Sequence, residues 1–407
     1  MTNWPKPRRR IVRAFEHFTH TWRWVAIGYL SPRDESWFLC RMTDANRTET
    51  YPMELRGYQA GPDLITALGI VGTGIYLPML AAQTSFTLGR AETCSLRVDQ
   101  KYLAPVHARI ERTVGSSGGI RVMNVSSGKN DIVFNSEIAK SGFMMDAADW
   151  FEIGESKYFA LSDEMRLARP AIMQILGVRQ YSLIDELLIA AAKHSSHHIL
   201  LVGEQGCDQA RLGSMIHYIS HRRRGLFHAV SEQPHLDSAM RQVIRDTGNG
   251  TLLIPLYKKG RLDERFVAMV TDLAMRQRLV ICAPSRKKID ASFPVTVTNR
   301  ASEITIPPLR VRKAEISELL DQWFIEDGSS LRFGALRPAM RERFLAYDWP
   351  KNLQELRESA DHLEELALYR SARQATKYSR ITRSTLRGWL RRLDLSLEFP
   401  LIPDKSK

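Results

Sequence analysis

The chain has 407 residues, of which 44% are hydrophobic and 25% charged, and its formal net charge is +13 at pH 7. This length is too great for one small core and predicts two or three domains of ordinary globular composition. The four cysteines are far apart without metal-ligand spacing, and no signal peptide or membrane-spanning stretch is apparent. We therefore expect a cytoplasmic protein with reduced thiols, no bound metal and no membrane partner.

The positive charge allows two interpretations, an acidic partner such as DNA or RNA, or a basic surface that aids solubility. Its distribution favours nucleic acid. Between Glu365 and Leu395 there are eight Lys/Arg against two acids.

Residues 1–80 form a basic N-terminal region to which the sequence assigns no identity. Aromatic and apolar residues at 22–27 and 36–40, separated by a Pro/Asp turn, predict two β-strands there.

Residues 81–165 predict a β-sandwich, because short strands alternate with turns. Four ordered segments resemble a forkhead-associated (FHA) domain: Phe-Thr-Leu-Gly-Arg at 86–90, the strand around His107, the Asn-containing turn at 124–131 and the closing strand at 149–154.

FHA domains bind phosphothreonine peptides, and the resemblance assigns two ligand positions, Arg90 for the phosphate and Asn130 for the peptide backbone. The serine expected to hold the phosphate is Ala104, and Pro105 offers no N–H. His107 is expected to be structural. A phosphothreonine protein and a phosphate-independent contact surface both remain open as partners of this domain.

Residues 172–308 predict an α/β domain with a parallel sheet. Its expected strands are 198–202, 250–254 and 279–283, and 262–275 is an expected helix. Residues 309–370 then predict helices, since apolar residues recur there at helical spacing, and the family resemblance described below identifies this segment as a helical lid.

The most informative motif of the chain follows the first of these strands, where residues 203–210 read Gly-Glu-Gln-Gly-Cys-Asp-Gln-Ala. A strand, a glycine turn and a helix make a phosphate-binding loop. The lysine that should reach the phosphates is replaced by Gln209, and the hydroxyl-bearing Mg²⁺ ligand by Ala210.

Five ordered segments of this region resemble the AAA+ domain of sigma-54-dependent transcription activators. They lie at 201–206, 215–222, 248–256, 306–312 and 347–356. The resemblance identifies the loop as a degenerate P-loop with Gly203, Glu204, Gly206 and Gln209 at its nucleotide-facing positions.

ATP hydrolysis in this family needs a lysine, an acidic pair and arginines around the phosphates. The corresponding positions hold Gln209, Pro255, Leu256, Ser285 and Gln354. Arg300 is the nearest candidate for an arginine acting in trans, although it does not align cleanly. We therefore predict an inactive ATPase without a bound cofactor and without tight ATP binding. Residues 229–249 also lack the family's sigma-contact loop, so no contact with sigma-54 is expected.

Residues 371–407 form a basic tail in which 381–395 resembles the recognition helix of a Fis-type helix-turn-helix. Thr382 or Ser384 is expected to cap the helix. Apolar residues at 386, 389, 390 and 393 predict a buried face. The resemblance assigns DNA contacts to Arg383, Ser384, Arg387, Arg391 and Arg392, while a solvated basic helix is the alternative.

The sequence thus predicts a multidomain regulator with an FHA-like sandwich, a degenerate AAA+ domain with its lid, and helix-turn-helix-like terminal helices. The leading hypothesis is a non-catalytic, DNA-binding transcription regulator in signal transduction. It would act as a homo-oligomer if it reads paired half-sites. The alternative is a phosphopeptide- or protein-binding scaffold of a larger bacterial complex that does not bind DNA.

Overall fold

The computed structural model of the chain describes residues 64–113, 118–126, 130–193, 198–369, 373, 376–377 and 381–395, and the backbone of two strands near the N-terminus. These strands, β1 (Arg23–Gly28) and β2 (Trp37–Met42), pair antiparallel. They confirm the strands expected at 22–27 and 36–40. The rest of the N-terminal region up to residue 63 lies outside the described residues.

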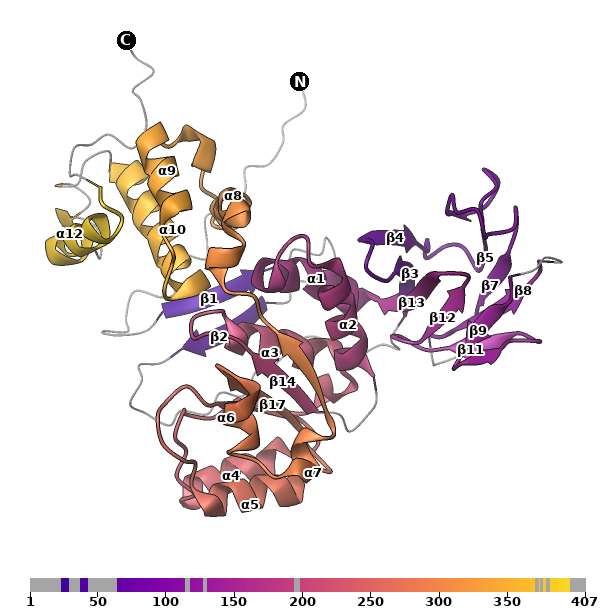
Figure 1. Ribbon diagram of the computed structural model, residues 1–407, viewed down its shortest axis with the longest axis horizontal. Helices are drawn as coiled ribbons and strands as arrows, with labels where there is room; N and C mark the ends of the chain where they lie inside the picture. The colour runs from indigo at the N-terminus through magenta and orange to yellow at the C-terminus, as the bar shows by residue number, and fades with distance from the viewer. Residues whose placement is uncertain are drawn as a thin grey trace, which may run out of the picture.

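Residues 65–162 form a β-sandwich of two sheets, seen on the right of Figure 1. The sheet orders are β10-β9-β12-β13-β3-β4 and β11-β8-β7-β5-β6. Alternate side chains of the strands point inward, as Phe86 and Leu88 do in β5, and the two sheets enclose one apolar core. The strands are β3 (Ile65–Ile70), β4 (Ile75–Pro78), β5 (Ser85–Gly89), β6 (Leu96–Arg97), β7 (Ala108–Arg112), β8 (Ile120–Asn124), β9 (Ile132–Phe134), β10 (Glu137–Ile138), β11 (Phe143–Met145), β12 (Trp150–Ile153) and β13 (Ser156–Ser162). The predicted sandwich is confirmed.

The sandwich starts earlier than the sequence predicted. Strand β3 pairs with both β13 and β4, so residues 65–78 belong to the six-stranded sheet and not to an N-terminal region ending at residue 80. Gly72 and Gly74, which interrupt this apolar window, lie in the turn between β3 and β4 with φ of +77° and +72°. Glycine adopts such φ values without steric penalty. The broken apolar window is therefore a hairpin of the sandwich.

A parallel five-stranded sheet follows, in the order β15-β16-β17-β14-β18. Its two faces are covered by different helices, because Val280 and Cys282 of β17 share a core with α1–α3, whereas Leu279 and Ile281 share one with α4–α6. The strands are β14 (His198–Val202), β15 (Phe227–Ala229), β16 (Thr251–Pro255), β17 (Arg278–Ala283) and β18 (Ala301–Thr305), and the helices are α1 (Asp163–Leu176), α2 (Tyr181–Ala192), α3 (Gln209–Ile219), α4 (Ser238–Thr247), α5 (Glu264–Leu273), α6 (Arg286–Asp290) and α7 (Val295–Thr298).

The three expected strands correspond to β14, β16 and β17, and the expected helix at 262–275 corresponds to α5. The sequence missed the two edge strands. β15 has only three residues, and β18 buries only Ile304, so neither has the continuous apolar run of a central parallel strand.

A buried polar contact joins the sandwich to the α/β domain. Asp185 of α2 is fully buried and accepts hydrogen bonds from the Tyr76 hydroxyl at 2.6 Å and from the Gly72 N–H at 3.0 Å. Arg169 of α1 also donates to the Tyr76 oxygen and lies over its ring. Burial raises the pKa values of Tyr76 and Asp185. Because these groups come from both domains and satisfy one another, they fix the orientation of the sandwich.

The remaining helices form a bundle at the upper left of Figure 1, with the α/β domain between it and the sandwich. They are α8 (Ile316–Glu326), α9 (Pro338–Ala346), α10 (Asn352–Tyr369) and α12 (Arg383–Arg392). The Phe344 ring lies 5.3 Å from the Trp349 ring and 6.3 Å from the Trp389 ring, between centroids. The helical lid and the terminal helix are thus present as predicted. Within the described ranges, no helix combines the length and apolarity needed to span a bilayer.

Glu364 of α10 makes the stability of this bundle sensitive to pH. Its carboxylate lies with those of Asp327 and Asp361, and burial together with these charges raises its pKa to about 7, while Arg357 opposes the shift. The folded protein therefore holds a proton that the unfolded chain, with a glutamate pKa of about 4.3, releases at lower pH. This stabilisation is complete below about pH 4 and is lost as the pH rises to about 7.

We expect Glu364→Gln to remove this part of the decline in unfolding free energy between about pH 4 and pH 7. Urea denaturation at several pH values measures it, with Glu358→Gln at a half-buried position of the same helix as the control. An identical pH profile for Glu364→Gln and the wild type would contradict the assignment.

Candidate functional site

The loop at residues 203–208 begins where β14 ends, between the neighbouring strands β17 and β18. The chain turns through Gly206 and Asp208, which have φ of +85° and +62°, and α3 then begins at Gln209. The strand, glycine turn and helix expected of a phosphate-binding loop are therefore present.

Gln209 is turned back into this loop. Its side chain is buried, and its Nε2 donates a hydrogen bond of 2.5 Å to the carbonyl oxygen of Glu204. The Tyr257 hydroxyl donates to the Gly203 carbonyl at 3.2 Å. Burial raises the pKa of the Cys207 thiol to about 12, so this cysteine stays protonated at neutral pH. These side chains hold the loop from within, and none of them supplies a cation for a phosphate.

The carboxyl ends of β16 and β17 hold no carboxylate at the positions where hydrolysis would need one. Leu256 follows β16 and is buried. Ser285 follows β17 and caps α6, accepting the Lys288 N–H at 3.4 Å. Neither residue supplies a carboxylate that could hold Mg²⁺ or polarise water.

The start of α10 lies directly on the loop. The Gln354 N–H donates to the Gly206 carbonyl at 3.0 Å, and Asn352 Nδ2 donates to the Gln205 carbonyl at 3.1 Å. A Cβ on Gly206 would lie 2.1 Å from the Lys351 carbonyl oxygen. We call the contacts of Gln205 and Gly206 with residues 351–354 the loop–lid latch.

Asn352 is the central residue of this latch. It is buried, its Oδ1 accepts the Leu309 N–H at 2.9 Å, and its Nδ2 also lies 3.3 Å from a Glu204 carboxylate oxygen. Arg310 donates to the same Glu204 oxygen at 2.5 Å and, as the main cause, lowers the pKa of Glu204. The sequence contained Asn352 within the segment 347–356, but only as part of a motif, so its structural role was missed.

The side chains of the two remaining positions considered from the sequence make their contacts outside the loop. The Gln354 side chain is exposed and donates to Glu358 at 3.3 Å, so only its backbone takes part in the latch. Arg300 is exposed just before β18 and contacts the Met275 sulfur.

We expect Gln209→Lys not to restore ATP hydrolysis, because Leu256 and Ser285 still provide no metal ligand. The variant also loses the bond to Glu204 and buries a cation, so its unfolding free energy should fall by about 1–3 kcal/mol. Phosphate release and urea denaturation measure the two effects, with Gln242→Lys on exposed α4 as the control. Magnesium-dependent phosphate release by the Gln209→Lys variant would contradict this prediction.

The two phosphopeptide positions lie around one loop of the sandwich. Arg90 follows β5 with an exposed side chain, and its N–H donates to the Ala104 carbonyl at 3.2 Å. Asn130 Nδ2 donates to the Tyr102 carbonyl at 2.5 Å. The structural role expected of His107 is confirmed, since it is 1% exposed and its Nδ1 accepts the Ala104 N–H. The structure therefore brings Arg90 and Asn130 to the same loop, where Asn130 already holds the backbone.

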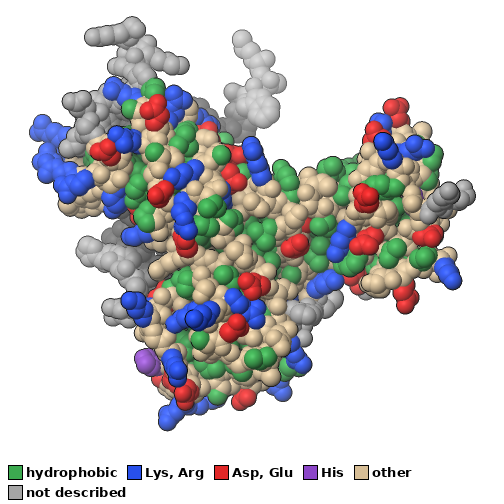
Figure 2. Space-filling view, in the orientation of Figure 1, with side chains coloured by type: hydrophobic (Ala, Val, Ile, Leu, Met, Phe, Trp, Pro, Cys, Tyr) green, Lys and Arg blue, Asp and Glu red, His purple; other side chains and the backbone are tan. Residues whose placement is uncertain are grey.

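Helix α12 has the two faces that the sequence predicted. Thr382 is the N-cap and accepts the Thr385 N–H, while Ser384 bonds only to the Thr382 hydroxyl. Leu386, Trp389, Leu390 and Leu393 are buried. The exposed residues are Arg383, Ser384, Arg387, Arg391 and Arg392. Figure 2 shows Lys and Arg side chains gathered over this helix. The helix that would precede it falls largely on residues 370–380, most of which lie outside the described part of the chain.

The buried face of α12 is attached to α10. Trp389 Nε1 donates to the Ser359 hydroxyl at 2.8 Å. Arg392 lies 3.4 Å from the carboxylate of Glu355, which is itself buried and accepts the Lys351 N–H. Arg392 is thus engaged within the protein, whereas no hydrogen bond or ion pair is found for the side chains of Arg383, Arg387 and Arg391 among the described residues.

No protein-family model and no curated protein sequence matches the chain. Solved structures similar to it include NtrX from Brucella abortus, which is 16% identical over 46% of this chain and 49% of NtrX, with a TM-score of 0.36. The FHA domain of CT664 from Chlamydia trachomatis is 11% identical over 24% of this chain and 95% of that domain, with a TM-score of 0.21.

EmbR from Mycobacterium tuberculosis, solved with a low-affinity phosphopeptide, is 15% identical over 24% of each chain, with a TM-score of 0.21. The present chain spans about half the length of NtrX. It is similar to FHA domains and to NtrX, a sigma-54-activator-type protein, each over part of its length.

Proposed function

We propose that the protein is a non-catalytic, DNA-binding transcription regulator. In this proposal the sandwich binds a protein partner, the α/β domain with its lid is a scaffold, and the basic tail binds DNA. The observation that carries it is the row of exposed arginines on α12, whose opposite face is anchored in the lid.

The spacing of this row suits a polyanion. Arg383, Arg387 and Arg391 recur every fourth residue, so they lie on one side of the helix and about 6 Å apart along its axis. We call these three residues the arginine row. A DNA strand carries phosphates at regular intervals along its backbone. Guanidinium groups bind phosphate through charge-assisted hydrogen bonds.

The N-terminus of α12 supports the same function. Its first turn contains no acidic residue and begins with Arg383. A cation at the positive end of the helix dipole is unfavourable by about 0.3–1 kcal/mol in the free protein. A phosphate bound there would be attracted by both the N–H groups and the arginine. This arrangement favours an anionic partner over a merely solvated helix.

The scaffold role of the α/β domain is supported by its loop. Gln209 stands where the resemblance places the lysine, Leu256 and Ser285 stand where it places catalytic groups, and the loop–lid latch ties the loop to the start of α10. We propose that the domain neither hydrolyses ATP nor needs it to position α12. We do not expect contact with sigma-54.

A second candidate function is phosphopeptide binding by the sandwich, which the exposed guanidinium of Arg90 favours. Calorimetry with a phosphothreonine peptide and its unphosphorylated counterpart tests this function. Arg90→Ala should abolish a phosphate-dependent difference, whereas Arg97→Ala on β6 should leave it unchanged.

Fluorescence anisotropy with duplex DNA from upstream of the protein's own gene tests the main proposal. We expect binding whose affinity falls steeply with salt, because phosphate contacts release counterions. No binding at low salt, or a stable protein complex that is indifferent to DNA, would favour the scaffold alternative.

A further inference from the structure

A second group of cations lies at the carboxyl edge of the parallel sheet. The loops after β16 and β17 and the short helix α6 carry six of them: Lys258, Lys259, Arg261, Arg286, Lys287 and Lys288. Arg286 pairs with Asp290 and Glu303, and Lys288 donates to the Gly260 carbonyl at 2.8 Å. The other four are exposed, and no ion pair is found for them within the described ranges. We call these four residues, Lys258, Lys259, Arg261 and Lys287, the basic rim.

This edge is where α/β sheets bind ligands, because the loops that follow parallel strands converge there. In this chain the edge carries six cations beside Glu232, and among the described residues no group of metal-ligating side chains is found there. The ligand class that matches it is therefore anionic.

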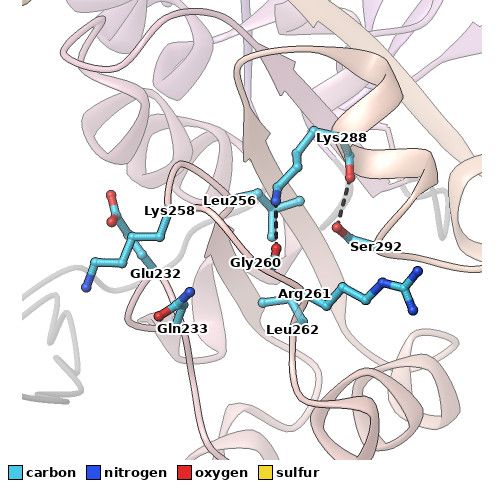
Figure 3. A pocket seen from close by; sticks show the side chains of 9 residues that line it. All are labelled: Glu232, Gln233, Leu256, Lys258, Gly260, Arg261, Leu262, Lys288 and Ser292. Carbon is cyan, nitrogen blue, oxygen red and sulfur yellow. Dashed lines mark hydrogen bonds between the residues drawn. The ribbon is translucent and has the colours of Figure 1, made fainter.

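The shape of the edge excludes a small enclosed ligand. The hollow between these loops has a volume of about 10 Å³, which is room for about one water molecule. In Figure 3, Lys258 and Arg261 point away from the hollow in different directions, while Lys288 reaches Gly260 and closes one side. Diverging cations on an exposed rim match an extended polyanion and not a single bound phosphate.

We propose that the basic rim is a second DNA-backbone contact surface that acts together with the arginine row of α12. This inference rests on the proposed function, since the DNA held by α12 is the polyanion that the rim would contact. Backbone contacts carry no sequence information, so the rim adds affinity equally for all duplexes.

Anisotropy titrations on specific and random duplexes at several salt concentrations test this inference. The rim variant is Lys258→Ala with Lys259→Ala and Arg261→Ala. Its control is Arg241→Ala with Arg245→Ala and Arg276→Ala, which removes the same charge from exposed residues on α4 and just after α5. We expect the rim variant to lose about tenfold affinity for both duplexes and to reduce the slope of log affinity against log salt by about 2–3. The control should change neither quantity.

Charge-preserving exchange checks that charge and not folding is responsible. Lys258→Arg with Lys259→Arg and Arg261→Lys should keep the wild-type slope. A rim variant that matches the control, while substitution of the arginine row abolishes binding, would overturn the rim and leave the proposed function intact. Polyglutamate serves as a probe for an acidic protein partner. A rim variant that no longer binds polyglutamate but keeps the wild-type affinity for DNA would also overturn the inference, since the partner of the rim would then be an acidic protein. If the wild type binds no DNA, both proposals fail.

Discussion

Replacing the arginine row of α12 with alanine (Arg383→Ala, Arg387→Ala and Arg391→Ala) is expected to weaken DNA binding about 100-fold at moderate salt. Each arginine would lose a charge-assisted hydrogen bond to phosphate, which contributes about 1 kcal/mol. The slope of log affinity against log salt should fall by about 3, since each lost phosphate contact contributes about 0.9.

The fold should tolerate these substitutions. All three side chains are exposed, and the residues that anchor α12 are others, chiefly Trp389 bonded to Ser359 and Arg392 beside Glu355. The control is the alanine triple at Arg241, Arg245 and Arg276. In Figure 1, α4 and α5 lie at the bottom of the α/β domain, whereas α12 lies at the upper left. Equal losses in both triples would show that only net charge matters and would contradict a specific role for the helix.

Gly206→Ala is expected to lower the unfolding free energy by about 3 kcal/mol and to release the lid from the loop. Two effects add at this position. The residue has φ of +85°, where an alanine is strained, and the new Cβ would meet the Lys351 carbonyl oxygen at 2.1 Å. The Lys351 carbonyl oxygen belongs to the backbone, so it cannot move aside as a flexible side chain could. The loop–lid latch must therefore open.

Gly328→Ala separates these two effects. Gly328 has φ of +72°, but a Cβ there meets no atom within 4 Å. Its substitution should therefore cost only the strain of the positive φ, about 1 kcal/mol. Urea denaturation gives both values, and hydrogen exchange at the start of α10 reports release of the lid. Similar losses for the two variants would contradict the close approach of lid and loop.

The sequence predicted those parts of the site that are encoded by neighbouring residues. The strand, glycine turn and helix at 198–219 form one local pattern, and the buried face of α12 follows from apolar residues at helical spacing. Replacement of the catalytic groups, such as lysine by Gln209, can also be seen without a structure. In each of these three cases the prediction depends only on the types of residues that lie close together in the sequence.

The parts that the sequence could not predict are contacts between distant segments. Asn352 meets Gln205 across 147 residues, and Asp185 meets Tyr76 across 109. No periodicity identifies such pairs. The early start of the sandwich was missed for a related reason, because β3 belongs to it only through pairing with β13, almost a full domain later in the chain. The ion pair between Arg392 and Glu355 is likewise a contact that no local pattern predicts, and the DNA contact expected of Arg392 stays a prediction.

The most direct test of the account is the affinity of the wild-type protein for duplex DNA across a range of salt concentrations, measured with and without ATP and Mg²⁺. We predict that affinity declines steeply with salt, since the arginine row would bind phosphates. We also predict identical curves with and without ATP and Mg²⁺, since the loop–lid latch already positions α12 without nucleotide. Absence of binding at low salt, or binding that requires ATP, would contradict it.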